Sequence, residues 1–240
     1  MAKPKDKDRR AVLEQLKKEQ QRAEKRRTSI IITASAVVAL AIIAVPAWQL
    51  IRQEQAAAGD LETLGQPADA AGCDDVTTES AKGNNDHRTQ GEQIAYEQSP
   101  PAFGPHYDTT AEFSRKFYSA SDRPEVEFLV HNLEHGYNIL WYDETIAEDA
   151  DQLAAVRAIS KKFEGTEMSD KFIAAPWTAE DGDPFPDGKH VALTHWSVGE
   201  DPEGGEQVGV WQYCDAPSGE AVAQFVEDYP YSDAPEPAAM

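Results

Sequence analysis

Four of the six histidines fall between residues 87 and 135 of this 240-residue chain, and their imidazoles are the side chains best suited to chemistry. The densest element is Val130–Tyr137, VHNLEHGY. If it is helical, His131 and His135 lie at positions i and i+4 on one face, and Glu134 lies one turn from His131. If it is extended, the two imidazoles are about 13 Å apart, too far to share an ion. The local conformation therefore decides whether a metal can bind here.

A second element, Ser99–Tyr107 (SPPAFGPHY), presents His106. Its three prolines and Gly104 restrict the backbone, which suits a fixed ligand, although a stiff loop with one histidine is also common without any function. Imidazole suits zinc and copper, and the usual affinity order favours Cu²⁺. We therefore predict a copper or zinc site whose ligands are His106, His131 and His135, with His87 or Glu134 as a fourth group.

Two other interpretations stay open. In the first, the domain is a membrane-tethered interaction or assembly module, and the histidines only hydrogen-bond the loop to the sheet. In the second, residues 131–135 (HNLEH) form the H-x-x-E-H zinc signature of a hydrolase, with Glu134 activating water. That signature belongs inside a long helix, but here Gly136 and an apolar run follow at once. The sequence therefore favours a domain that is not an enzyme.

The elements that must position these residues follow from apolar periodicity. Gly136 is expected to end a helical turn as a C-cap. We predict strands at Val126–Val130, Asn138–Tyr142, Lys171–Pro176, Val191–Ser197 and Gln207–Tyr213, and helices at Ala147–Phe163 and Gly219–Tyr229. This succession predicts an α+β fold, with helices packed on a mixed β-sheet.

The histidine-bearing motifs resemble the bacterial domain-of-unknown-function family numbered 3105. The resemblance rests on four segments and covers most of residues 72–229: Tyr96–His106 (YEQSPPAFGPH), Leu129–Gly136 (LVHNLEHG), Phe172–Trp177 (FIAAPW) and Leu193–Trp196 (LTHW). Phe103 replaces a small residue of the family pattern, and His195 precedes the tryptophan. The resemblance implies a short exported or membrane-anchored domain, and it implies no activity.

An apolar segment precedes this domain. Residues 28–51 contain no charged side chain, and their length is sufficient for a helix that crosses a hydrocarbon core of about 30 Å. Residues 1–27 hold 11 Lys and Arg, whereas the other flank has Arg52 alone. We therefore predict a single-pass membrane protein with a basic cytoplasmic arm that contacts lipid headgroups. The alternative is a cleaved leader, because Ala56–Ala58 are small.

The remaining residues are divided into a linker (52–72), an extracytoplasmic domain (73–229) and a disordered tail (230–240). From Gln53 onward there are 10 Lys and Arg against 38 Asp and Glu, which argues against binding nucleic acid and leaves a membrane or exported protein as the partner. Cys73 and Cys214 both lie outside the membrane on this topology, where disulfides persist, so we expect them to pair. The alternative is a pair of thiolate metal ligands.

Overall fold

The computed structural model describes residues 59–81, 85–199 and 206–239, together with scattered helical residues between 17 and 44. The chain divides into two units, Met1–Arg52 and Gln53–Met240. Most of the predicted span, residues 28–51, lies outside the described residues. Among the residues that are described, no helix is long and apolar enough to cross a membrane. The membrane span therefore stays a prediction.

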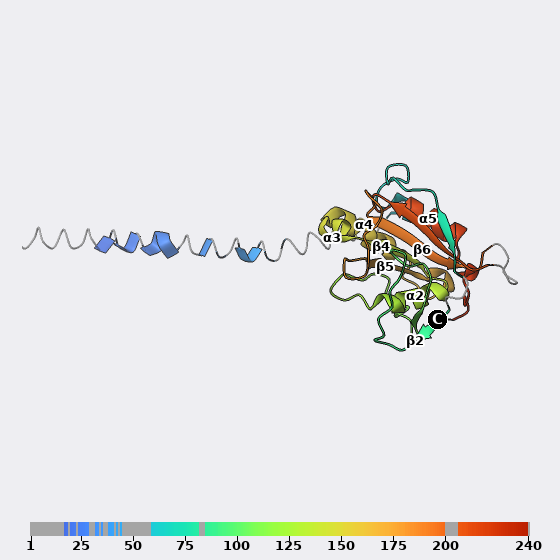
Figure 1. Cartoon of the computed structure of the whole chain (residues 1–240). Coiled ribbons are helices and arrows are strands. Elements are labelled where there is room, and N and C mark those ends of the chain that lie inside the picture. The colour runs from blue at the N-terminus through green and yellow to red at the C-terminus, as the bar shows by residue number, and fades with distance from the viewer. Residues whose placement is uncertain are drawn as a thin grey trace, which may run out of the picture. The chain divides into compact units, whose positions relative to one another are not determined.

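The second unit is built on a five-stranded mixed sheet, in the order β1-β7-β6-β4-β5 (Figure 1). β4 and β5 are parallel, and the other neighbouring strands are antiparallel. The strands are β1 (Thr77–Ser80), β4 (Asn138–Tyr142), β5 (Phe172–Pro176), β6 (Val191–Ser197) and β7 (Val208–Cys214). The predicted α+β fold with a mixed sheet is confirmed. The edge strand β1 was not predicted, because its exposed TTES sequence carries no apolar alternation.

The helices are α2 (Val126–Glu134), α3 (Glu144–Glu148), α4 (Ala150–Lys161) and α5 (Gly219–Asp228), with short 3-10 turns η1 (Leu61–Thr63), η2 (Met168–Asp170) and η3 (Tyr231–Asp233). Two further short strands, β2 (His87–Arg88) and β3 (His106–Tyr107), pair in parallel away from the main sheet. The single helix predicted over residues 147–163 is two helices. Asp149 separates them, and its carboxylate accepts backbone N–H groups of Asp151 and Gln152 as the N-cap of α4.

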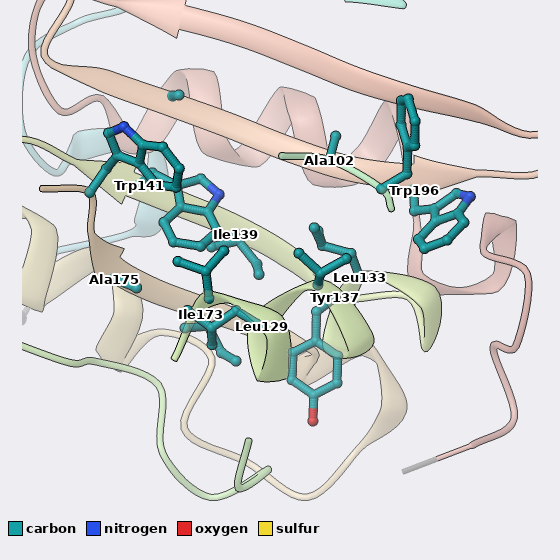
Figure 2. Packing of buried hydrophobic residues seen from close by; sticks show 14 of the residues in the cluster. Ala102, Leu129, Leu133, Tyr137, Ile139, Trp141, Ile173, Ala175 and Trp196 are labelled. Carbon is teal, nitrogen blue, oxygen red and sulfur yellow. The ribbon is translucent and has the colours of Figure 1, made fainter. Parts of the chain in front are cut away.

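Each face of the sheet carries its own apolar cluster. Successive residues of β4 point to opposite faces, so Ile139 and Trp141 join the cluster under α2, whereas Leu140 and Tyr142 join the cluster under α3, α4 and α5. Figure 2 shows Leu129 and Leu133 of α2 directed at the sheet. Burying each such leucine contributes about 1.5–3 kcal/mol, so the α2 face is held firmly against the strands.

The predicted strand at residues 126–130 is wrong, because this segment is the first half of α2. Val126, Leu129, Val130 and Leu133 recur at positions i, i+3, i+4 and i+7, and all are buried. That is the apolar stripe of a helix. Residues 126–130 alone have the β-branched and aromatic content of a strand, and the helical spacing is complete only when Leu133 is included.

The domain is longer at both ends than predicted. Leu64 is only 5% exposed and Gly65 forms a β-bridge with Ser218, so residues assigned to the linker belong to the fold. The tail at 230–240 was expected to be disordered, but it forms η3 and buries Ala234. Both segments are poor in apolar residues, and their order comes from contacts with distant parts of the chain. The predicted Cys73–Cys214 disulfide is present.

Candidate metal centre

The last turn of α2 brings three polar side chains to one place. His131 and Glu134 lie in the final turn of the helix, and His135 is its C-cap. The helix stops there because Gly136 has a φ of +92°, which side chains with a Cβ rarely adopt. The helical alternative for this element is therefore the correct one, and it places His131 Nε2 3.0 Å from His135 Nε2.

Two more histidines reach this turn through the small parallel pair. β2 and β3 are paired so that His87 lies opposite His106. Their ring centroids are 4.7 Å apart, and both rings contact His131, at 5.0 Å and 4.8 Å. Figure 1 shows β2 beside α2, near the C-terminus of the chain. His87 and His106 are 19 residues apart in the sequence, so neither helical nor strand spacing would place them together. They meet because β2 pairs with β3.

Glu134 is the centre of the cluster. Its side chain is 1% exposed, and its Oε2 atom lies 3.0 Å, 3.6 Å and 3.9 Å from the Nε2 atoms of His106, His87 and His131. The four ligand atoms all lie within 4.8 Å of one another, so this group can hold a metal ion. Three imidazoles and one carboxylate make a donor set that zinc and copper both accept.

The rigid loop fixes the protonation pattern of His106. His106 Nδ1 lies 2.8 Å from the Gly104 carbonyl, which can only accept a hydrogen bond, so Nδ1–H donates. In the neutral ring, Nε2 then carries a lone pair that faces the Glu134 carboxylate. Such a backbone contact on the far nitrogen is the usual support of a metal-binding histidine. Two lone pairs 3.0 Å apart require a proton or a cation between them.

The electrostatics keep Glu134 charged. Burial by itself raises the pKa of its carboxyl, but it is outweighed by a hydrogen bond from His106 when the shared proton lies on Nε2, by the hydrogen bond from Asn85 and by the nearby imidazoles, which together lower the pKa to about 2. The Asn85 Nδ2 donates at 2.7 Å to Oε1, the oxygen that the histidines leave free. The cluster therefore presents a buried anion at neutral pH.

The imidazole of His131 is neutral at the same pH. Burial, together with the neighbouring His135 and His106, lowers its pKa to about 4. Burial also lowers the pKa of His135. Neutral imidazole is the form that binds a metal. His131 and His135 therefore do not have to release a proton when they bind a metal near pH 7.

The predicted ligands His87, His106, His131 and Glu134 converge, whereas His135 lies to one side. Glu134, His135 and Glu236 form a second group of mutually close ligand atoms. Neither Asn85 nor Glu236 was predicted. Asn85 has no distinguishing sequence pattern. Glu236 lies in the C-terminal tail, whose sequence has no apolar periodicity that would predict its packing against α2.

The other two histidines, His190 and His195, belong to neither group of ligand atoms and make structural contacts. His190 Nδ1 lies 2.7 Å from an Asp143 carboxylate oxygen, and His195 Nδ1–H donates to the Tyr137 carbonyl at 3.2 Å. His190 lies just before β6, and His195 lies within it. The two cysteines are joined to each other and supply no thiolate.

Comparison with known protein families matches residues 87–240 to the family described as protein of unknown function DUF3105. The matched region contains all four converging ligands, and it confirms the resemblance drawn from the sequence motifs. No curated protein and no solved structure matches the chain.

Proposed function

The chain belongs to the DUF3105 family, and we propose that its domain binds one copper or zinc ion through His87, His106, His131 and Glu134. The description of the family assigns no activity, so the proposal rests on the site alone. The domain carries this ion outside the cytoplasm, on a single N-terminal membrane helix.

One observation carries the proposal. In a tetrahedral site with metal–ligand bonds of about 2.0–2.1 Å, the ligand atoms lie about 3.3 Å apart. The distances from Glu134 Oε2 to the three Nε2 atoms are 3.0 Å, 3.6 Å and 3.9 Å, which bracket this value. The other separations within the group are at most 4.8 Å, so the side chains would have to draw closer together to form the shell around an ion.

The competing interpretation is that the same residues only hold the loops to α2. It is favoured by Asn132, which is fully buried and exchanges two hydrogen bonds with the backbone of Ala111. In that case a proton shared between His106 and Glu134 satisfies the buried pair, and the domain serves as an interaction module. A hydrolase is less well supported, because Glu134 faces three imidazoles and is placed as a ligand.

The membrane attachment rests on the sequence. Its support is the charge-free run at residues 28–51, the 11 basic residues before it, and the disulfide, which suits an oxidising compartment. A protease added to intact cells should then degrade the domain after Arg52 and spare the arm before Thr28. Protection of the domain in cells whose other surface proteins are cleaved would contradict this topology.

The metal proposal is tested by titrating the purified full chain, stripped with a chelator, with Zn²⁺ or Cu²⁺. A metal at 100 times its Kd that binds only the native state should stabilise it by about 2.7 kcal/mol. His87→Ala should remove this stabilisation, because His87 supplies one of the four ligands. The fold should survive, since the His87 side chain is already 45% exposed.

His190→Ala is the matched control, because His190 is a histidine of similar exposure, 33%, that also faces a carboxylate. It should keep both the uptake and the stabilisation. If micromolar metal does not bind the folded wild-type chain, or if the two alanine variants behave alike, the histidines are structural and the interaction module is the better interpretation.

A further inference from the structure

A second group of ligand atoms touches the first one. Oxygen or nitrogen atoms of Glu134, His135 and Glu236 lie within 4.8 Å of one another, next to the four-ligand cluster. Glu134 belongs to both groups. A carboxylate offers about four lone-pair positions on two oxygens, so one carboxylate can bind two ions at once.

We propose that His135, Glu236 and Glu134 form a second, outer metal position, so that the domain binds a pair of copper or zinc ions bridged by the Glu134 carboxylate. This inference rests on the proposed function, because the carboxylate that would bridge the two ions, Glu134, is also the one that holds the inner ion. Protein sites that hold two ions in this way keep them about 3.5–4 Å apart.

His135 is suited to this role by its position. As the C-cap of α2 its side chain is 9% exposed, and its Nε2 lies 3.0 Å from His131 Nε2 and 3.5 Å from Glu236 Oε2. Two facing imidazole nitrogens can share only one proton. Its Nδ1 is buried without a hydrogen-bond partner, so the polar contacts of this imidazole are made through Nε2, the atom that faces Glu236.

The C-terminal segment delivers Glu236. The Glu236 N–H donates at 2.9 Å to the carbonyl of Glu134, which ties the segment to the end of α2. Lys171 Nζ donates to the carbonyls of His135, Pro237 and Ala239 at 2.6 Å, 2.8 Å and 2.7 Å, and so joins the same two segments. The backbone of the tail is thus held at Glu236 and at the residues that follow it.

The two positions differ in how open they are. The inner one has four protein ligands, three of them buried, which is the closed shell of a site that retains its ion. The outer one has three, and the Glu236 side chain is 54% exposed. A three-ligand position at the surface keeps a place for water or for another donor. The outer ion should therefore bind more weakly and exchange faster than the inner one.

The test counts bound ions in the full-length chain. Titration with Zn²⁺ should give two equivalents, the second at least 10-fold weaker than the first. Glu236→Gln should lose the second equivalent and keep the first. The matched control is Glu227→Gln, an exposed acid on α5 that should change neither equivalent. Electron paramagnetic resonance of the wild-type chain titrated with Cu²⁺ should show two magnetically coupled Cu²⁺ ions. Glu236→Gln should instead give the spectrum of a single uncoupled Cu²⁺ ion.

The possible failures are distinguishable. If the wild type binds one equivalent that His87→Ala abolishes, the inner site stands and the outer position is refuted. If a second equivalent binds but its signal is uncoupled and survives Glu236→Gln, it sits elsewhere on the acidic surface, and the outer position is again refuted. If no ion binds at all, both proposals fall.

Discussion

Two histidines of this domain are equally buried and have opposite surroundings. His106 and His195 are both 0% exposed, and each donates its Nδ1–H to a backbone carbonyl. The Nε2 of His106 faces the Glu134 carboxylate at 3.0 Å, whereas the Nε2 of His195 has no partner. Burial alone therefore does not mark a site. What distinguishes His106 is its contact with an anion, because its Nε2 faces Glu134 Oε2. The imidazoles of His87 and His131 approach the same oxygen atom.

The largest predicted effect is on metal affinity, and it should come from removing the negative charge of Glu134. Glu134→Gln keeps the shape of the side chain and removes its charge. Metal affinity should fall by at least about 100-fold, because even the outer contacts of metal ligands are worth about 10–100-fold. Calorimetry with Zn²⁺ measures this loss. An affinity within a few-fold of the wild type would show that the carboxylate is not a ligand.

The next effect concerns how the C-terminal segment is held against α2. In Gly136→Ala the new Cβ would lie 2.3 Å from the Tyr231 carbonyl, in addition to the strain of a φ of +92°. Gly188 also has a positive φ, +81°, but a Cβ there meets nothing within 4 Å. Gly188→Ala should therefore cost only the strain, about 1–2 kcal/mol, and Gly136→Ala clearly more.

Chemical denaturation of both alanine variants gives the two free energies of unfolding. If the two costs are equal, the close approach of Tyr231 is not maintained in solution, and the tail does not pack on α2 as described.

The effect of His195 is the smallest when it is counted per pH unit, and it tests the buried histidine that lacks an anion. Burial lowers its pKa to about 4, although the hydrogen bond to Tyr137 opposes this. In the unfolded chain the pKa is about 6.5, so the unfolded state binds more protons between these values. Stability should therefore fall as the pH decreases from about 6.5 towards 4, by about 1.4 kcal/mol per pH unit for this residue.

His195→Gln should make that slope shallower by about the same amount. The readout is the slope of the unfolding free energy against pH in metal-free protein, so a general loss of stability in the variant does not affect it. His131 contributes a slope of the same sign, because its pKa is also lowered to about 4. An unchanged slope in His195→Gln would show that His195 is accessible to water.

Much of the fold could be predicted from local patterns. β6 was predicted with its observed bounds, as was β4, and the bounds of α5 were predicted to within one residue. These elements have long apolar runs or a clear helical stripe. The predictions were wrong where the local composition does not match the structure that the segment adopts. Residues 126–130 have the composition of a strand but form part of a helix. The tail has the composition of a disordered segment, but contacts with distant residues hold it in place.

The candidate site was predicted only in part. The helical spacing of His131, Glu134 and His135 is a local property and could be read from the sequence. Neither the pairing of His87 with His106 nor the arrival of Glu236 follows from spacing, because both depend on chain segments that meet only after folding.

By itself the sequence determined the chemistry of the domain: the imidazoles and carboxylates, the glycine that ends α2, and the two cysteines. These follow from residue types and from spacings within one or two helical turns. Only the tertiary structure decided which carboxylate is the centre, and that His135 belongs to a second group. A metal site requires ligand atoms within a few ångströms, and that proximity is set by packing between segments that the order of residues does not specify.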